Sequence, residues 1–231
     1  MIIKTEGFVF HTIKYSESSV IAHIYTKDYG IGSYIMNSVR GKRSKAAYFQ
    51  PFSHVSFAAY KKDGANIHRI KEIQFKEIFV DLYTDIAKVS LTQFLGEFLY
   101  KTIHSEEPNL GLYSFLEQKI TELETTDKTG DFHIRFLMQL MSFFGVRPEN
   151  NYSKSNQYFD VTNGFFREFD NVECLSLEDS YIIYLLLSDE KFALQKEKRS
   201  KILNIFLQYY KEHVHNFGTL KSLDVFQTIF N

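Results

Sequence analysis

The first 75 residues alternate between apolar and polar positions, and many of the apolar ones are β-branched or aromatic. Such period-two alternation is typical of strands with one buried and one exposed face. The segment Lys27-Asp28-Tyr29-Gly30 predicts a tight turn between two of the runs. The predicted strands cover residues 7–13, 19–26, 31–36, 53–60 and 67–73. Five short strands without a helical period predict a small closed barrel, for which the five-stranded OB fold is the obvious candidate.

From residue 82 onward the apolar residues recur at steps of three and four, which indicates amphipathic helices. Ser176 is the predicted N-cap of one helix, and Gly145 with Pro148 ends another. The predicted helices cover residues 84–104, 112–123, 132–144, 177–187, 197–216 and 222–230. Because striped helices need a shared core, the sequence predicts an α+β protein, with an OB-fold barrel at residues 1–80 and a helical domain at residues 81–231.

A polar excursion interrupts the helical half at residues 150–171. The aromatic pairs Tyr158-Phe159 and Phe165-Phe166 lie on either side of Asn163-Gly164. An Asn-Gly pair between two β-prone runs is a strong signal for a tight hairpin. We therefore expect a small β-hairpin inserted into the helical domain.

Charge is divided unevenly along the chain. Residues 1–80 hold 12 Lys plus Arg against 6 Asp plus Glu, a net charge of +6, and the rest hold 15 against 22, a net charge of −7. Residues 39–45, Val-Arg-Gly-Lys-Arg-Ser-Lys, contribute the cations Arg40, Lys42, Arg43 and Lys45. A basic loop on a small barrel suits a polyanion such as single-stranded nucleic acid, and a solvated charged turn is the alternative interpretation.

Barrels of this kind bind nucleic acid with cations that contact phosphates and aromatic rings that stack on bases. Beyond the basic loop, the candidate phosphate-binding cations are Lys61, Lys62 and Arg69. The candidate stacking rings are Tyr34, Tyr48, Phe49 and Tyr60. We expect most aromatic residues of this half to be core residues and only one or two to face a ligand.

Catalytic motifs are weak or missing. The sequence has no Gly-x-x-x-x-Gly-Lys-Ser/Thr loop for nucleotide phosphates, and no pair of carboxylates stands out from the surface charge. Its one cysteine, Cys174, lacks a neighbouring cation that would make it a nucleophile. His213 and His215 fall on different sides of a predicted helix and would chelate a metal poorly. An enzyme acting on nucleic acid is therefore a weak hypothesis, and we expect no catalytic residues.

Two further absences bear on location. The first residues lack the continuous apolar run of a signal peptide, and no segment approaches the roughly 18 uninterrupted apolar residues of a membrane span. We therefore expect a soluble, cytoplasmic protein without membrane contacts.

Motifs in three parts of the chain occur together in a recognisable order. They are Gly7-Phe8-Val9-Phe10, Tyr15-Ser16-Glu17, Ile24-Tyr25-Thr26, Gly41-Lys42-Arg43-Ser44-Lys45 and Gln50-Pro51-Phe52 in the barrel, the helix at residues 136–144 with its break at Gly145-Val146-Arg147-Pro148, and Ile205-Phe206-Leu207-Gln208-Tyr209-Tyr210 with Leu220-Lys221-Ser222-Leu223 near the end. In order and spacing these motifs resemble the family of the bacterial recombination mediator RecO.

The resemblance implies a DNA-repair protein that binds single- and double-stranded DNA through its barrel and anneals complementary strands. It also implies two protein partners, RecR and the acidic C-terminal tail of single-strand-binding protein, and an indirect role in loading RecA. A bacterial, nucleoid-associated protein is expected on the same ground. The basic front half of the chain would then hold the DNA.

The same resemblance implies that the acidic tail binds the helical domain, although that half is acidic on average. A local basic patch is therefore expected there. The candidate residues are Arg135, Lys198, Arg199, Lys201 and Lys221. A solvated helix face is the alternative interpretation of these cations.

One departure from the family concerns metal. Many members carry a four-cysteine zinc site on the excursion after the glycine-proline break, whereas residues 150–171 contain no cysteine. The resemblance therefore implies no zinc and no other cofactor here, with Tyr158, Phe159, Phe165 and Phe166 packing in its place.

A second hypothesis remains open beside the DNA-binding mediator. The barrel would then be a platform for RecR or a peptide, and the protein would be an interaction adaptor with little DNA affinity of its own.

Overall fold

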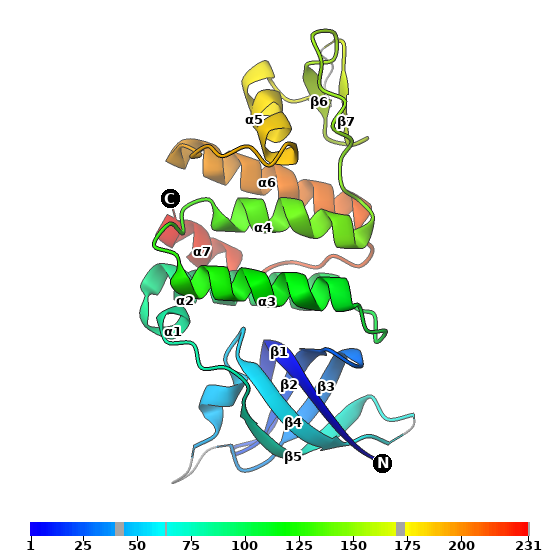
Figure 1. Ribbon diagram of the computed structural model, residues 1–231, viewed down its shortest axis with the longest axis vertical. Helices are drawn as coiled ribbons and strands as arrows, with labels where there is room; N and C mark the ends of the chain where they lie inside the picture. Colours follow the sequence, from blue (N-terminus) through cyan, green and yellow to red (C-terminus); the bar gives the residue numbers. More distant parts are fainter. Residues whose placement is uncertain (40–43, 63, 170–173, 231) are drawn as a thin grey trace. The chain divides into compact units, whose positions relative to one another are not determined.

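The computed structural model describes residues 1–39, 44–62, 64–169 and 174–230 (Figure 1). Residues 2–75 contain a closed barrel with the strand order β1-β2-β3-β5-β4. The strands are β1 Ile2–Lys14, β2 Val20–Thr26, β3 Gly30–Met36, β4 His54–Tyr60 and β5 Ile67–Phe75. All neighbouring strands are antiparallel except β3 and β5, which pair in parallel. The predicted five-stranded OB-type barrel is confirmed.

Strand β1 is longer than the sequence pattern predicts. It begins at Ile2 rather than at residue 7, because Ile2 to Phe8 pair with β4 while Gly7 to Lys14 pair with β2. A bulge after Val9 separates the two parts of the β1–β2 ladder. Long, bent strands of this kind let one strand serve two neighbours at a barrel corner.

The turn between β2 and β3 matches the sequence prediction. Thr26 and Gly30 are the last paired residues of this hairpin, and the Thr26 hydroxyl donates to the Gly30 carbonyl at 2.9 Å. Gly30 has φ +62°, and a Cβ there would lie 2.7 Å from the backbone of residues 105–107. Both the dihedral angle and the close approach therefore require glycine at this position.

The barrel interior is filled by alternate residues of each strand. The buried side chains include Ile3, Val9, Ala22, Ile24, Tyr34, Met36, Val55, Phe57, Ala59 and Ile70. Tyr34 and Phe57 meet edge to face, with ring centroids 4.8 Å apart. Because side chains alternate across a strand, the residues between these positions form the outer surface.

Helices follow the barrel, as the change in periodicity predicts. The elements are α1 Asp81–Thr84, α2 Ile86–Thr102, α3 Leu110–Thr125, α4 Phe132–Leu140, α5 Leu177–Leu187, α6 Lys196–His213 and α7 Leu223–Phe230. The predicted third helix changes after Leu140 into a 3₁₀ turn, Met141–Phe144, that ends at Gly145 with φ +68°. Ser176 is the N-cap of α5, as predicted, and its hydroxyl accepts from the Asp179 amide. None of the helices in the described ranges is long and apolar enough to cross a membrane.

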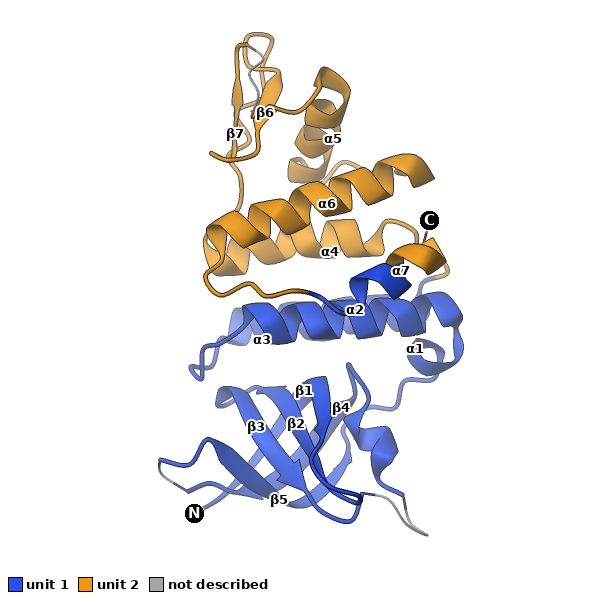
Figure 2. Ribbon diagram, turned by 180° about the vertical axis from the view of Figure 1, so that it is seen from behind, with its two compact units in different colours: residues 1–126, 220–226 blue, residues 127–219, 227–231 orange. Residues whose placement is uncertain are grey.

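The chain forms two compact units, residues 1–126 with 220–226 and residues 127–219 with 227–231 (Figure 2). The first unit therefore includes α1, α2 and α3 as well as the barrel. Outward-facing aromatic residues of the barrel explain this grouping. Phe8 lies 5.4 Å from the Tyr113 ring of α3, and the Tyr25 hydroxyl donates to the Asn109 carbonyl. The compact units thus divide elsewhere than at the change from strands to helices near residue 80.

Two glutamates cap helix N-termini within the first unit. The Glu124 carboxylate of α3 accepts from the amides of Val80, Asp81 and Leu82, where α1 begins. The Glu97 carboxylate of α2 accepts from the amides of residues 221 and 222 and from the Ser222 hydroxyl, just before α7. Each carboxylate satisfies amides that have no partner inside their own helix, and each is favoured by the positive end of the helix dipole.

We expect Glu97→Gln to lower the free energy of unfolding by about 1.5–3 kcal/mol at pH 7, the range for hydrogen bonds to a charged group. Burial opposes ionisation of Glu97, but the hydrogen bonds from Ser222 and Lys221 outweigh it, so its pKa lies below the ordinary 4.5. The stabilisation is therefore present above pH 4.5 and is lost as the pH falls through the lower pKa of the folded state. Urea unfolding across this pH range should show wild type and variant converging in acid, and a constant gap would contradict the assignment.

Candidate nucleic-acid interface

Strand register defines the outer surface of the barrel. Directly paired residues lie on the same face of a sheet, and successive pairs join six residues into one row across the five strands. This outer row is Ile13, Ile21, Ile35, Arg69, Tyr60 and Ile2. Ile2, Ile13 and Tyr60 are exposed large side chains. The row is therefore an accessible strip that is mostly apolar and carries one cation and one tyrosine.

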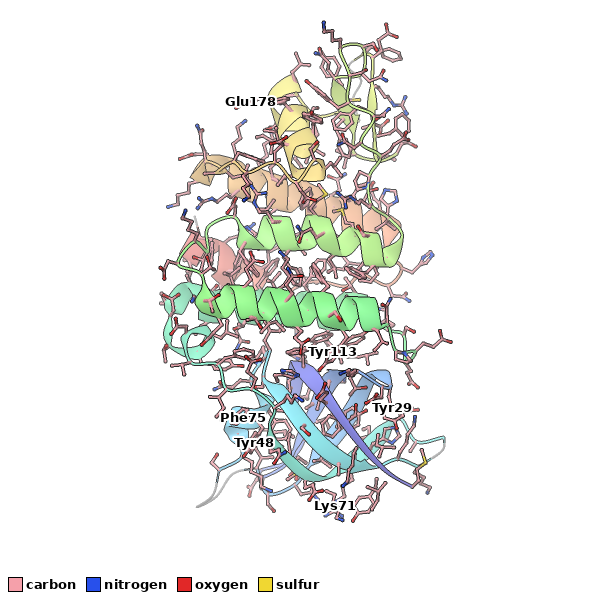
Figure 3. The ribbon with its side chains drawn as sticks, viewed as in Figure 1. Tyr29, Tyr48, Lys71, Phe75, Tyr113 and Glu178 are labelled. Carbon is pink, nitrogen blue, oxygen red and sulfur yellow. The ribbon has the colours of Figure 1, made fainter. Side chains whose placement is uncertain are left out.

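Lys71 extends the cationic part of the outer row. A bulge between Ala58 and Ala59 leaves Lys71 as the extra residue of β5, because Ala59 pairs with Ile70 and Ala58 with Glu72. Tyr60, Arg69, Ile70 and Lys71 line an open hollow of about 580 Å³, which we name the Tyr60 hollow. In Figure 3, Lys71 lies at the end of the barrel remote from Tyr113 of α3. Two exposed cations and an exposed phenol ring thus share one concave surface.

The β4–β5 loop carries Lys61 and Lys62. Lys62 is exposed, whereas the Lys61 ammonium lies 4.6 Å from the centre of the Tyr29 ring, a cation–π contact. Lys61 follows Tyr60 directly in the chain. Neither lysine is among the residues that line the Tyr60 hollow.

The basic loop is only partly within the described residues. Arg40, Lys42 and Arg43 lie outside them, so their predicted phosphate contacts stay predictions. The two ends of the segment are anchored: the Val39 amide donates to the Ser18 carbonyl at 2.7 Å, and the Lys45 amide donates to the Val39 carbonyl at 2.9 Å. Lys45 is half-buried at the start of the 3₁₀ turn Ala46–Phe49.

Two of the four predicted stacking rings are wrong. Tyr34 is 2% exposed and Phe49 is 5% exposed, both within the barrel core, because their strand and turn positions point inward. Tyr48 is half-buried and packs on Phe75, with ring centroids 4.4 Å apart. Tyr60, which is 47% exposed, has an accessible ring. Of the predicted set, Tyr60 is therefore the ring best placed to meet a base.

The candidate residues do not form a single patch. Figure 3 shows Tyr48 and Tyr29 on opposite sides of the barrel, so the surface beside Lys45 is separate from the surface beside Lys61. Tyr60, Arg69 and Lys71 share the Tyr60 hollow, whereas Lys61 lies on the Tyr29 ring. Lys71 is absent from the residues predicted from sequence, although strict alternation from Arg69 would have found it, because it predicts Lys71 on the same face.

The candidate tail-binding cations are largely engaged within the second unit. Lys198 and Lys201 both bind Asp179, a residue of α5 that is 1% exposed, at 3.1 and 2.5 Å. Lys198 also forms an ion pair with Glu178, which Figure 3 marks on α5. A buried carboxylate needs such partners. The two lysines of α6 therefore link this helix to α5 through ion pairs. The sequence did not predict this structural role.

The two arginines of the set are also engaged. Arg135 bonds to Asp131 and donates to the carbonyls of Glu190 and Phe192. The Arg199 guanidinium donates to the Leu194 carbonyl and lies so close to Gly130 that a Cβ there would meet it at 2.5 Å. Lys221, in the first unit, is exposed. A basic patch formed by all five cations is therefore a weaker prediction than it was from the sequence alone.

The excursion forms the predicted hairpin, with β6 Tyr158–Asp160 paired to β7 Phe165–Arg167 and Gly164 at φ +72°. Phe159 and Phe166 are buried and pack edge to face. The Asn151 amide bonds to both backbone groups of Phe166, and buried Asp160 accepts from the Asn163 amide and forms an ion pair with Arg167. Aromatic packing, hydrogen bonds between side chains and the backbone, and one ion pair thus stabilise this hairpin.

These residues do not fit a four-cysteine zinc site. Cys174 is the one cysteine of the sequence, and within the described residues no group of three or more His, Cys, Asp or Glu side chains could hold a metal. The interior position of the hairpin is taken by the rings of Phe159 and Phe166. A hairpin without zinc therefore stays a prediction.

Comparison with known proteins covers the whole chain. The family model "Recombination protein O N terminal" matches residues 1–79, and "Recombination protein O C terminal" matches residues 83–224. The proteins called "DNA repair protein RecO" from Phocaeicola vulgatus, Bacteroides fragilis and Flavobacterium psychrophilum are similar, with identities of 33%, 31% and 30%. Each alignment spans 100% of both chains.

We expect the hairpin to be stable without metal. Treatment with a strong chelator should leave the thermal unfolding midpoint unchanged, because the hydrogen bonds, the ion pair and the aromatic packing of the hairpin involve no metal ion. Asp160→Asn should lower the free energy of unfolding by about 1.5–3 kcal/mol, since the charged partner of Arg167 is removed. Thr162→Ala, at an exposed turn position, is the control. A chelator-induced fall in the midpoint would contradict the prediction.

Proposed function

Because the chain belongs to the RecO family of DNA repair proteins, we propose that it is a recombination mediator that binds single-stranded DNA across the Tyr60 hollow. The observation that carries this proposal is the shared position of Arg69, Lys71 and Tyr60 on one concave, exposed surface. Cations there would contact phosphates, and the Tyr60 ring would stack on a base. The basic loop would add phosphate contacts through Arg40, Lys42, Arg43 and Lys45.

Such a surface would bind without regard to sequence. Phosphate contacts position a strand but carry no base information, and stacking accepts every base because each has a π face. Strand annealing of arbitrary sequences requires this indifference. The same cations would also hold the backbone of double-stranded DNA.

The proposed partners are those that family membership suggests: RecR, the acidic C-terminal tail of single-strand-binding protein and, indirectly, RecA. Action at the bacterial chromosome follows from the same proposal. For the tail contact we favour Lys221, because it is exposed, whereas Arg135, Lys198, Arg199 and Lys201 bind residues of their own unit. We propose no catalytic residue.

A second candidate function is supported by the apolar part of the outer row. Ile13, Ile21 and Ile35 follow one another in the row and form a partly exposed aliphatic strip that ends beside Arg69, and contiguous apolar surface of this kind often marks a protein interface. The barrel would then be a platform for RecR, and the protein an adaptor with little DNA affinity of its own.

We expect Arg69→Glu with Lys71→Glu to weaken single-stranded DNA binding and to reduce its salt dependence. For every phosphate that the variant no longer neutralises, the slope of log K against log salt should fall by about 0.7 for a single strand. Fluorescence anisotropy with a labelled oligonucleotide at several salt concentrations measures both effects. Lys196→Glu with Lys211→Glu, at two exposed cations of α6, is the control matched for net charge, because each double variant lowers it by four. Unchanged affinity and slope in the double variant would refute the proposed interface.

The adaptor function makes a different prediction. Ile21→Ser with Ile35→Ser should reduce capture of RecR in a pull-down while leaving oligonucleotide affinity unchanged, because the change removes apolar contact area and no charge. Wild type that retains RecR but barely shifts oligonucleotide anisotropy would favour the adaptor over the DNA-binding mediator. Equal RecR capture by variant and wild type would refute the strip as the platform.

A further inference from the structure

A second outward row of the barrel is built differently from the first. Register joins His11, His23, Ser33 and Ile67 across β1, β2, β3 and β5. Strands 2 and 3 form the face on which OB folds generally bind oligonucleotides. This histidine row therefore lies on a face suited to nucleic acid, but it carries rings in place of arginine or lysine.

Tyr100 of α2 completes a stack of three rings on this row. Its ring centroid lies 4.8 Å from that of His11 at an interplanar angle of 16°, and 4.4 Å from that of His23. The Lys101 ammonium lies 5.6 Å from the centre of the Tyr100 ring. All three rings are half-buried rather than enclosed. They present a partly accessible aromatic surface with a cation beside it.

A hollow opens beside this stack. It has a volume of about 170 Å³ and is lined by His23, Ser33, Asn66, Tyr100, His104 and Glu106, among others. We name it the Tyr100 hollow. Pockets for drug-sized ligands are usually about 300–1,000 Å³, so this one suits a single planar ring system. Asn66 lies in the β4–β5 loop, which also contacts ligands in OB folds.

His23 contributes a neutral ring to the lining of this hollow. Its Nδ1 atom is hydrogen-bonded to the Ser33 hydroxyl at 3.1 Å, and its Nε2 atom has no exposed surface, so neither nitrogen is open to a ligand. Burial lowers the pKa of His23 to about 4, so the ring is uncharged near pH 7. The polar groups that face solvent are instead the exposed side chains of Asn66, His104 and Glu106. The edge of a nucleobase carries donors and acceptors that match such groups.

We propose that the Tyr100 hollow holds one unpaired nucleobase, stacked against the Tyr100 ring and hydrogen-bonded at its edge by the exposed side chains of Asn66, His104 and Glu106. The neutral rings of His11 and His23 support the Tyr100 ring from the barrel side. A base inside a duplex has its edge occupied and both faces stacked, so it cannot enter. The site therefore distinguishes an unpaired base from a paired one. This inference rests on the proposed DNA binding, but the site is distinct from the Tyr60 hollow.

The test uses the full-length protein with an oligonucleotide that carries one 5-iododeoxyuridine, irradiated and digested for mass spectrometry. A crosslink to Tyr100 or His23 supports the site. Tyr100→Leu should weaken single-strand affinity about 5- to 150-fold, the range for loss of one base stack, with an unchanged salt slope. Tyr100→Phe keeps the ring and should bind as wild type does, and Tyr181→Leu, an exposed tyrosine of α5, is the control.

Two results separate this inference from the proposed function. If Tyr100→Leu binds with wild-type affinity while Arg69→Glu with Lys71→Glu does not, the Tyr100 hollow is refuted and the interface stands. If wild type does not bind oligonucleotide, the interface is refuted, and ligand-detected NMR with deoxycytidine monophosphate tests the hollow alone. There, a signal that disappears in Tyr100→Leu supports the hollow, and the absence of a wild-type signal refutes it.

Should Tyr100→Leu fail to fold by circular dichroism, His104→Ala offers the same test, because His104 is exposed at the rim and outside the ring stack. Weaker single-strand binding with an unchanged salt slope supports the site. Wild-type affinity combined with crosslinks confined to other residues overturns it.

Discussion

Parallel pairing of β3 with β5 is the constraint on which the outer surface of the barrel depends. It joins Ile35 to Arg69 and Ser33 to Ile67, and thereby closes a sheet that the other pairings leave open. Parallel neighbours need a long connection, which here includes residues 37–53 and β4. Closure fixes which side chains face outward, since a shift by one residue would exchange the inner and outer faces. Both outward rows exist because of this one register.

Among the helices, buried or half-buried carboxylates connect elements that are distant in sequence, as the β3–β5 pairing does in the barrel. Glu124 and Glu97 accept from backbone amides before α1 and α7, and Asp179 accepts from Lys198 and Lys201. Each carboxylate acts on an element distant in sequence. An acidic helical half therefore does not mean an acidic solvated surface, because several of its charges are engaged in internal hydrogen bonds. The lysines beside Asp179 stabilise the fold, whereas Arg69 and Lys71 line an open surface.

Local patterns predicted much of the fold. Alternation identified the five strands, and Ser176 and the Asn163-Gly164 pair identified a helix cap and a hairpin turn, because these signals depend on neighbours in sequence. The candidate site was harder. Whether a tyrosine points into or out of a barrel depends on which of the alternating positions of its strand face the core. Tyr34 occupies an inward position and is buried, whereas Tyr60 occupies an outward position and is exposed. The engagement of Lys198 and Lys201 depends on α5, about 20 residues earlier in the chain, and composition cannot show it.

The proposed annealing function would require the protein to hold DNA firmly enough to gather it and loosely enough to release a duplex. Nearby carboxylates offset part of the positive charge of the barrel. Glu6 forms ion pairs with Lys27 and Lys76, and Glu72 follows Lys71 in the sequence. Few phosphates would be contacted at once, which keeps sequence-independent affinity modest. Preference for unpaired bases would then come from stacking and hydrogen bonding in the Tyr100 hollow. Pairing of that base with a complementary strand would remove it from the site, so that annealing itself would promote release.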